Sequence, residues 1–102
     1  MPDQLKIVEG SALTAQQKKD LLNRLARIEG QLRGVQKLIA MAADPSDCDA
    51  VAQQMAAARK ALDRSFVQLL MATVVTGSEQ AADLDEARST AARLAALLDK
   101  FA

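Results

Sequence analysis

A single cysteine, an absence of histidine and a row of arginines and lysines limit the chemistry that this sequence can perform. Cys48 is the only cysteine among 102 residues, so it cannot form an intrachain disulfide. Because the chain contains no histidine, the common nitrogen ligands of zinc and the common general bases are missing. These features argue against a zinc site and a catalytic triad. We therefore expect no metal, no cofactor and no enzymatic activity.

The stretch RLARIEGQLRG, residues 24–34, joins a helical apolar spacing to two glycines and three arginines. On a helical wheel Gly30 and Gly34 lie opposite the apolar row. The same outer half carries four cations: Lys19, Arg27, Arg33 and Lys37. Two glycines inside a helix cost about 2 kcal/mol relative to alanine. The bare face indicates close approach of nucleic-acid phosphates or of another subunit, or else a solvated basic face that tolerates glycine.

Charge is distributed unevenly along a chain whose formal net charge is zero. Residues 1–43 hold seven Lys or Arg against four Asp or Glu, whereas residues 44–102 hold six against nine. A net charge of zero weighs against a nucleic-acid-binding protein. Symmetric repetition of the basic segment in an oligomer would nevertheless build a broad positive surface.

The elements that position these residues are predicted to be helices throughout. We expect a mobile N-terminal arm over residues 1–13 and one all-helical domain over 14–102, with helices at about 14–42, 46–76 and 79–101. Thr14 and Gln17 form a predicted capping box, and Pro45 with the cap residue Ser46 separates the first two helices. Gly77 is predicted to end the second helix.

Apolar residues in the two long helices repeat at alternating spacings of four and three. In the first helix the seam comprises Leu21, Leu25, Ile28, Leu32, Val35 and Ile39. Such seams require a partner helix, and helices of this length are too long for a compact monomer. We predict an antiparallel four-helix-bundle dimer, with the third helix at its ends or joining further subunits. The chain shows no membrane span or signal peptide, so we expect a cytoplasmic protein.

The segments RLARIEGQLRGVQKLI and VAQQMAAARKAL, with a lone cysteine between them, resemble the CsoR/RcnR family of small helical bacterial repressors. The resemblance covers residues 19–75. It implies dimers assembled into a flat tetramer, which binds double-stranded operator DNA and leaves it when a sensor site is filled. It assigns the DNA contacts to six residues: Arg24, Arg27, Arg33 and Lys37, with Lys18 and Arg64 as weaker candidates.

The sensor positions implied by the resemblance differ from the family pattern. The family's metal ligands on the second helix align with Thr73 and Gly77, and neither binds a soft metal. The formaldehyde-responsive branch uses a cysteine equivalent to Cys48 with an N-terminal proline amine, here Pro2. We predict a repressor whose effector, formaldehyde or another electrophile or oxidant, acts at Cys48 with Pro2. The alternatives are a metal-responsive repressor with a non-standard site, a helical protein-interaction module, and a purely structural Cys48.

Overall fold

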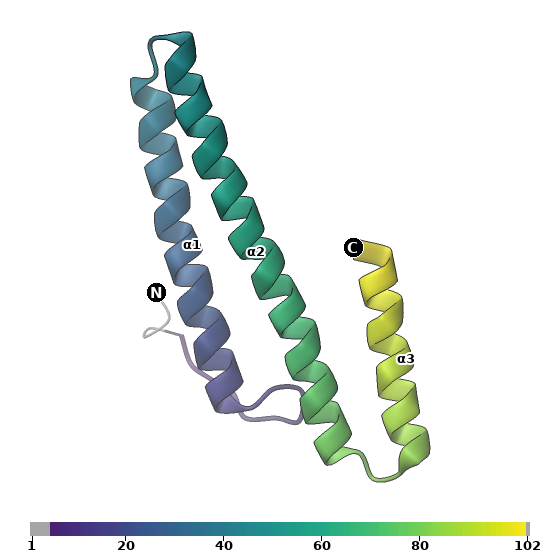
Figure 1. Cartoon of the computed structure of the whole chain (residues 1–102). Coiled ribbons are helices and arrows are strands. Elements are labelled where there is room, and N and C mark those ends of the chain that lie inside the picture. Colours follow the sequence, from purple (N-terminus) through teal and green to yellow (C-terminus); the bar gives the residue numbers. More distant parts are fainter. Residues whose placement is uncertain (1–4, 102) are drawn as a thin grey trace.

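The computed structural model describes residues 5–101, and all regular structure in this range is helical. Helix α1 spans Ala15–Met41, α2 spans Pro45–Gln80 and α3 spans Leu84–Phe101. Helices α1 and α2 form a long antiparallel hairpin, and α3 folds back along α2 on the side away from α1 (Figure 1). The predicted all-α protomer with three helices is confirmed.

The helices lie side by side in a single layer. The structure measures 60 × 32 × 13 Å, and its thinnest dimension is close to the diameter of one α-helix, about 10–12 Å. A single layer leaves both of its broad faces uncovered. Along the described residues, no helix combines the length and apolar character needed to cross a membrane.

Side-chain caps set the beginnings of α1 and α2. The Thr14 amide donates to Gln17 Oε1 at 2.8 Å, and the Gln17 amide donates to Thr14 Oγ1 at 3.1 Å, which confirms the predicted capping box. Helix α2 begins at Pro45, one residue earlier than expected. The Asp47 carboxylate accepts hydrogen bonds from the amides of Ala43 and Asp44 at 2.9 and 3.0 Å. Asp47 therefore caps this end, a role that the sequence had assigned to Ser46.

The end of α2 differs from the prediction, because the helix continues through Gly77 to Gln80. Gly77 does not have the positive φ of a helix-ending glycine. A Cβ added to Gly77 would lie 2.8 Å from Thr90 Cγ2 of α3. The glycine thus lets α3 approach α2 closely.

Helix α3 begins at Leu84, five residues later than predicted. The Glu86 amide donates to Asp83 Oδ1 at 2.8 Å, and the Ala82 amide donates to Glu86 Oε2 at 3.2 Å. Together these bonds satisfy two free amides at the helix start. The D-x-x-E spacing of these acids was a readable start signal that the sequence analysis missed.

The hairpin buries only part of the apolar seam predicted for α1. Leu21, Ile28 and Val35 are buried, and small α2 residues such as Ala58 and Ser65 are buried with them. The other predicted seam residues stay accessible: Leu25, Leu32 and Ile39 are 38%, 48% and 55% exposed. On α2, Met55, Leu62 and Leu69 are similarly accessible. We call these six exposed residues the apolar row.

Thr76 joins the last turns of α2 to the start of α1 by a hydrogen bond. It is the most buried residue that the structure describes, and its hydroxyl donates to Gln17 Oε1 at 2.9 Å. Gln17 Oε1 also accepts from the Thr14 amide. One amide oxygen therefore links the start of α1 to the last turns of α2.

Candidate functional site

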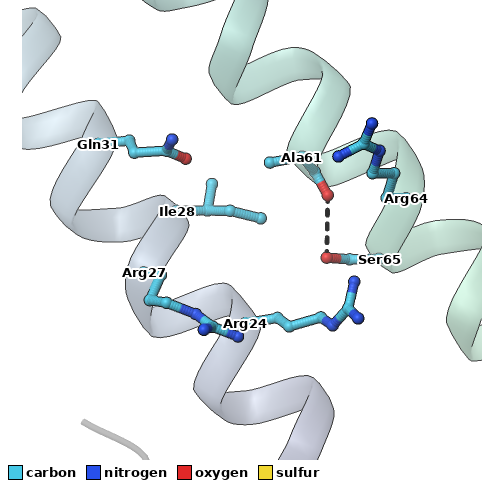
Figure 2. Close-up of a pocket in the computed structure, with 7 residues that line it drawn as sticks. All are labelled: Arg24, Arg27, Ile28, Gln31, Ala61, Arg64 and Ser65. Atoms are coloured by element: carbon cyan, nitrogen blue, oxygen red, sulfur yellow. Dashed lines mark hydrogen bonds between the residues drawn. The ribbon is translucent and has the colours of Figure 1, made fainter.

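Three arginines from two helices line one cleft between α1 and α2. Arg24 and Arg27 belong to α1, and Arg64 belongs to α2. The cleft has a volume of about 280 Å³, and Figure 2 shows Arg24 extending from α1 toward α2 while Ile28 points across between the helices. Gln31, Ala61 and Ser65 complete the lining. We call this site the arginine cleft.

The chemistry of the arginine cleft suits an anion. Among residues 5–101, no acidic side chain lines it, and a guanidinium stays protonated throughout the range in which proteins are folded. The Ser65 hydroxyl donates to the Ala61 carbonyl at 3.0 Å within α2 (Figure 2). The bond satisfies that hydroxyl locally, so the arginines remain the main hydrogen-bond donors of the cleft. Their planar forks match the geometry of phosphate oxygens.

A second hollow continues the cleft along the hairpin. It shares Arg24 and Arg27, adds Asp20, Asn23 and Gln68, and has a volume of about 600 Å³. Gln68 Oε1 is buried without a hydrogen-bond partner in the described part of the chain. Asp20 Oδ1 accepts a hydrogen bond from Gln16 Nε2 at 2.9 Å. Among the described residues, Asp20 is thus the one acidic side chain that lines this hollow, and the others are two arginines and two neutral amides.

The arginine cleft and the apolar row lie on opposite flanks of the hairpin's buried line. Successive residues of a helix are rotated by about 100°. Arg24 and Arg27 therefore fall on one side of the line marked by Ile28, and Leu25 and Leu32 fall on the other. A helix that covered the apolar row would leave the arginine cleft open to solvent.

The remaining predicted DNA-contacting residues lie outside this cleft. Lys18 Nζ donates to the Val8 carbonyl and so holds the arm against α1. Arg33 and Lys37 are exposed on the outward half of α1. Of the six cations assigned to DNA contacts, the structure brings Arg24, Arg27 and Arg64 together.

The two glycines that face outward from α1 are uncovered in a single chain. A Cβ built on Gly30 or Gly34 would have no neighbouring atom within 4 Å. Core packing inside the protomer therefore gives no reason for either glycine.

Sequence reasoning missed the neutral polar residues of the groove, Asn23, Gln31 and Gln68. Gln31 follows Arg27 by four residues and Arg24 by seven, so it shares their helix face. That spacing could have identified Gln31. The positions of Asn23 and Gln68 depend on how α1 packs against α2, which no local pattern specifies.

Cys48 is exposed and is the fourth residue of α2. Helix α2 begins at the end of the hairpin away from the arm (Figure 1). Within one chain it is separated from Thr73 by 73 − 48 = 25 helical residues, which is about 37 Å. Pro2 lies outside the described residues.

The donors at the predicted sensor positions do not fit a soft metal. The Thr73 hydroxyl donates to the Leu70 carbonyl at 2.8 Å, and Gly77 packs against Thr90. Among residues 5–101, no group of three or more His, Cys, Asp or Glu side chains is arranged to hold a metal ion. A lone thiol beside a hydroxyl lacks the nitrogen and sulfur donors that copper, nickel or zinc require.

Comparison with known protein families decides the affiliation of the chain. Residues 17–100 match the family described as metal-sensitive transcriptional repressor. The chain belongs to this family. The match extends the CsoR/RcnR resemblance from residues 19–75 through α3 and confirms it. No curated protein and no solved structure gave a match.

Membership supplies the general role that the geometry alone leaves open. Proteins of this family are repressors of transcription rather than enzymes, and they bind operator DNA as oligomers. The arginine cleft is a cationic surface of this chain. The family description refers to metals. In this chain, however, the described residues include no group of three or more His, Cys, Asp or Glu side chains that could hold a metal ion.

Proposed function

We propose that this protein is a DNA-binding transcriptional repressor whose arginine cleft contacts the phosphates of operator DNA. The observation that carries this proposal is the convergence of Arg24, Arg27 and Arg64 from two helices on one cleft, which no acidic residue of the described chain lines. Arg33 and Lys37, which are exposed on the outward half of α1, extend the contact surface. Lys18 is the weaker candidate, because its Nζ already donates to the Val8 carbonyl. Phosphate contacts fix the position of the protein, and operator choice then rests largely on DNA shape.

The apolar row supports assembly of the chain into a dimer and, in the family's manner, a flat tetramer. Leu32, Ile39 and Leu62 are about half exposed in the protomer, at 48%, 55% and 51%. Pairing two hairpins through these rows completes an antiparallel four-helix bundle and removes the residues from water. Because the arginine cleft lies on the other flank, each bundle carries two copies of it on an open surface.

Cys48 is the proposed point of effector action. In an antiparallel dimer, Cys48 of a second copy approaches Thr73, because both residues lie on the α2 seam. Formaldehyde can bridge the Cys48 sulfur and the Pro2 nitrogen through one carbon, forming a C–S and a C–N bond with loss of one water. This reaction requires removal of Met1, which exposes the secondary amine of Pro2.

Fluorescence anisotropy with duplex DNA from the protein's own promoter region tests the DNA-binding proposal. Affinity is expected to fall steeply between about 50 and 200 mM salt, because bound phosphates release counterions. Arg24→Ala should weaken binding and reduce the salt slope by about one for each lost phosphate contact. Arg88→Ala, an exposed change on α3, serves as the control.

Three results would contradict the proposal. Negligible affinity for duplex DNA at low salt would favour a helical protein-interaction module. Affinity that does not depend on salt would show that phosphate contacts do not contribute to DNA binding. A charge reversal at Arg27 that leaves operator binding intact would likewise exclude the arginine cleft from the interface.

The sensor proposal is tested by Cys48→Ser. The variant should bind operator DNA as the wild type does and should not be released by formaldehyde. Intact mass spectrometry should show the one-carbon bridge in the wild type and its absence in the variant. A serine variant that responds fully to formaldehyde would show that Cys48 is structural.

A further inference from the structure

Another cavity, separate from the arginine cleft and the hollow beside it, lies where the arm, α2 and α3 meet. It has a volume of about 260 Å³ and is enclosed on one side by Ser11 and Ala12 of the arm. The size is just below the range of pockets for drug-sized ligands, roughly 300–1,000 Å³. We call it the α2–α3 cavity, and its dimensions suit a small metabolite.

Two matched rows of residues face this cavity. Thr73, Gly77 and Gln80 recur along α2 at spacings of four and three, and Glu86, Thr90 and Arg93 recur along α3 in the same way. Such spacing places each set on one helix face. Helices α2 and α3 run antiparallel (Figure 1), and Gly77 faces Thr90, since a Cβ added to Gly77 would lie 2.8 Å from Thr90 Cγ2. The positions flanking this contact carry polar side chains instead of the apolar ones that normally join two helices.

The polar groups of the cavity keep hydrogen-bonding capacity for a ligand. Glu86 uses one carboxylate oxygen to accept from the Ala82 amide, which leaves its other oxygen free to accept. The Thr73 hydroxyl donates to Leu70 and can still accept. Within residues 5–101, the side chains of Thr90 and Arg93 make no hydrogen bond to the protein.

The charges of the lining select the class of ligand. Within the part of the chain that the structure describes, the cavity is lined by one cationic side chain, Arg93, and one anionic side chain, Glu86. A simple anion would be attracted by Arg93 and repelled by Glu86. A simple cation would be attracted by Glu86 and repelled by Arg93. A molecule that carries both charges satisfies both groups, with its carboxylate on the guanidinium and its ammonium on the carboxylate.

We propose that the α2–α3 cavity binds a small zwitterion of the α-amino-acid type. Its carboxylate lies on Arg93 and the Thr90 hydroxyl, and its ammonium lies on Glu86. The Ser11 and Thr73 hydroxyls provide further polar contacts at the wall. The binding site stands on the geometry alone, whereas its role as an effector site rests on the proposed repressor function.

The position of the cavity gives the bound molecule a route to the DNA-contacting groove. The arm leads directly into Thr14, whose capping partner Gln17 accepts the hydrogen bond from Thr76. Thr76 precedes the cavity residue Gly77. A ligand that draws the arm toward α3 therefore perturbs the hydrogen bond between Thr76 and Gln17, which joins α2 to α1. A change in the packing of α1 on α2 would also change the distance between Arg24 and Arg64.

Isothermal titration of the full chain with the twenty standard L-amino acids tests the site. At least one amino acid is expected to bind the wild type with a Kd below about 1 mM. Arg93→Gln should weaken that affinity about 10- to 100-fold, because it removes charged hydrogen bonds. Arg88→Gln, on the outward face of α3, is the matched control and should bind as the wild type does.

Two further measurements sharpen the result. The des-amino analogue of the bound amino acid should bind the wild type more weakly, because it leaves Glu86 without a cation. Adding the amino acid should lower operator affinity in the wild type and leave that of Arg93→Gln unchanged.

The proposal is wrong if no amino acid binds the wild type, or if Arg93→Gln and Arg88→Gln bind equally well. The effector role is wrong if the amino acid binds but operator affinity does not change. Operator binding by the ligand-free chain is measured separately. Failure of the cavity therefore leaves the repressor function intact, and failure of DNA binding leaves the cavity intact.

Discussion

Replacement of Gly30 and Gly34 by alanine tests whether the outer face of α1 contacts DNA, because it should change thermal stability and operator affinity in opposite directions. Both glycines are helical and exposed, and an added Cβ would meet no atom within 4 Å at either position. The gain in helix propensity is about 0.8–1.0 kcal/mol per site. No clash in the protomer offsets this gain, so the double variant should be about 2 kcal/mol more stable.

For a domain of this size, 1 kcal/mol corresponds to about 4–8 °C in Tm. The double variant should therefore melt about 8–16 °C higher in circular dichroism at a fixed protomer concentration. Its operator affinity should fall, because a methyl group then stands between the backbone and the DNA. Gln36→Ala is the control, since it changes an exposed side chain of the same helix without covering a bare backbone.

The outcomes distinguish three explanations for the glycines. A higher Tm with reduced DNA affinity supports close approach of DNA. A lower Tm would refute the calculation and show that another subunit covers this face. A higher Tm with unchanged DNA affinity would mean that the glycines are tolerated on a solvated basic face.

Three other changes follow from particular contacts. Gly77→Ala should weaken the packing of α3 on α2 and lower the Tm, because the added Cβ would collide with Thr90 Cγ2. Adding Thr90→Ser, which removes this Cγ2, should restore much of the lost Tm. If the single and double variants melt at the same temperature, this packing is wrong. Asp20→Asn should strengthen operator binding, because it removes the carboxylate that lines the hollow beside the arginine cleft. Unchanged or weaker binding in the anisotropy measurement would show that DNA binds elsewhere. Hydrogen bonds from two backbone amides lower the pKa of Asp47 below its ordinary value of 3.8, so its stabilising effect is present above that value and is lost as the pH falls through the lowered pKa. Denaturant titrations should accordingly show Asp47→Asn to be less stable than the wild type at neutral pH and equal to it in strong acid, and a difference that persists in strong acid would contradict the cap.

The prediction of helices succeeded where short-range rules apply. The Thr14 and Gln17 capping box and the break at Pro45 depend on residues within one turn, so sequence identified them closely. The prediction that Gly77 ends the second helix was wrong, because glycine can either end a helix or permit close contact between two helices. Only the position of Thr90 distinguishes these two roles, and Thr90 lies 13 residues away along the chain.

The candidate site shows the same division. Periodicity placed Gly30 and Gly34 on the outer face of α1, and both are exposed there. The helical wheel did not group Arg24 with Arg27, because it placed Arg27 with Arg33 on the outer half of α1. Packing of α2 groups Arg24 with Arg27, because Arg64 lies across the cleft from both.

The sequence by itself determined an all-helical chain, its capping signals, its basic front and the absence of metal-binding histidines, because composition and local spacing specify these properties. Only the tertiary structure decided which seam residues become buried and which remain in the apolar row. It also decided that three arginines share a cleft, and that polar residues of α2, α3 and the arm enclose a cavity. These features depend on the rotation and register of one helix against another. Many side chains set that register together, so no single motif encodes it.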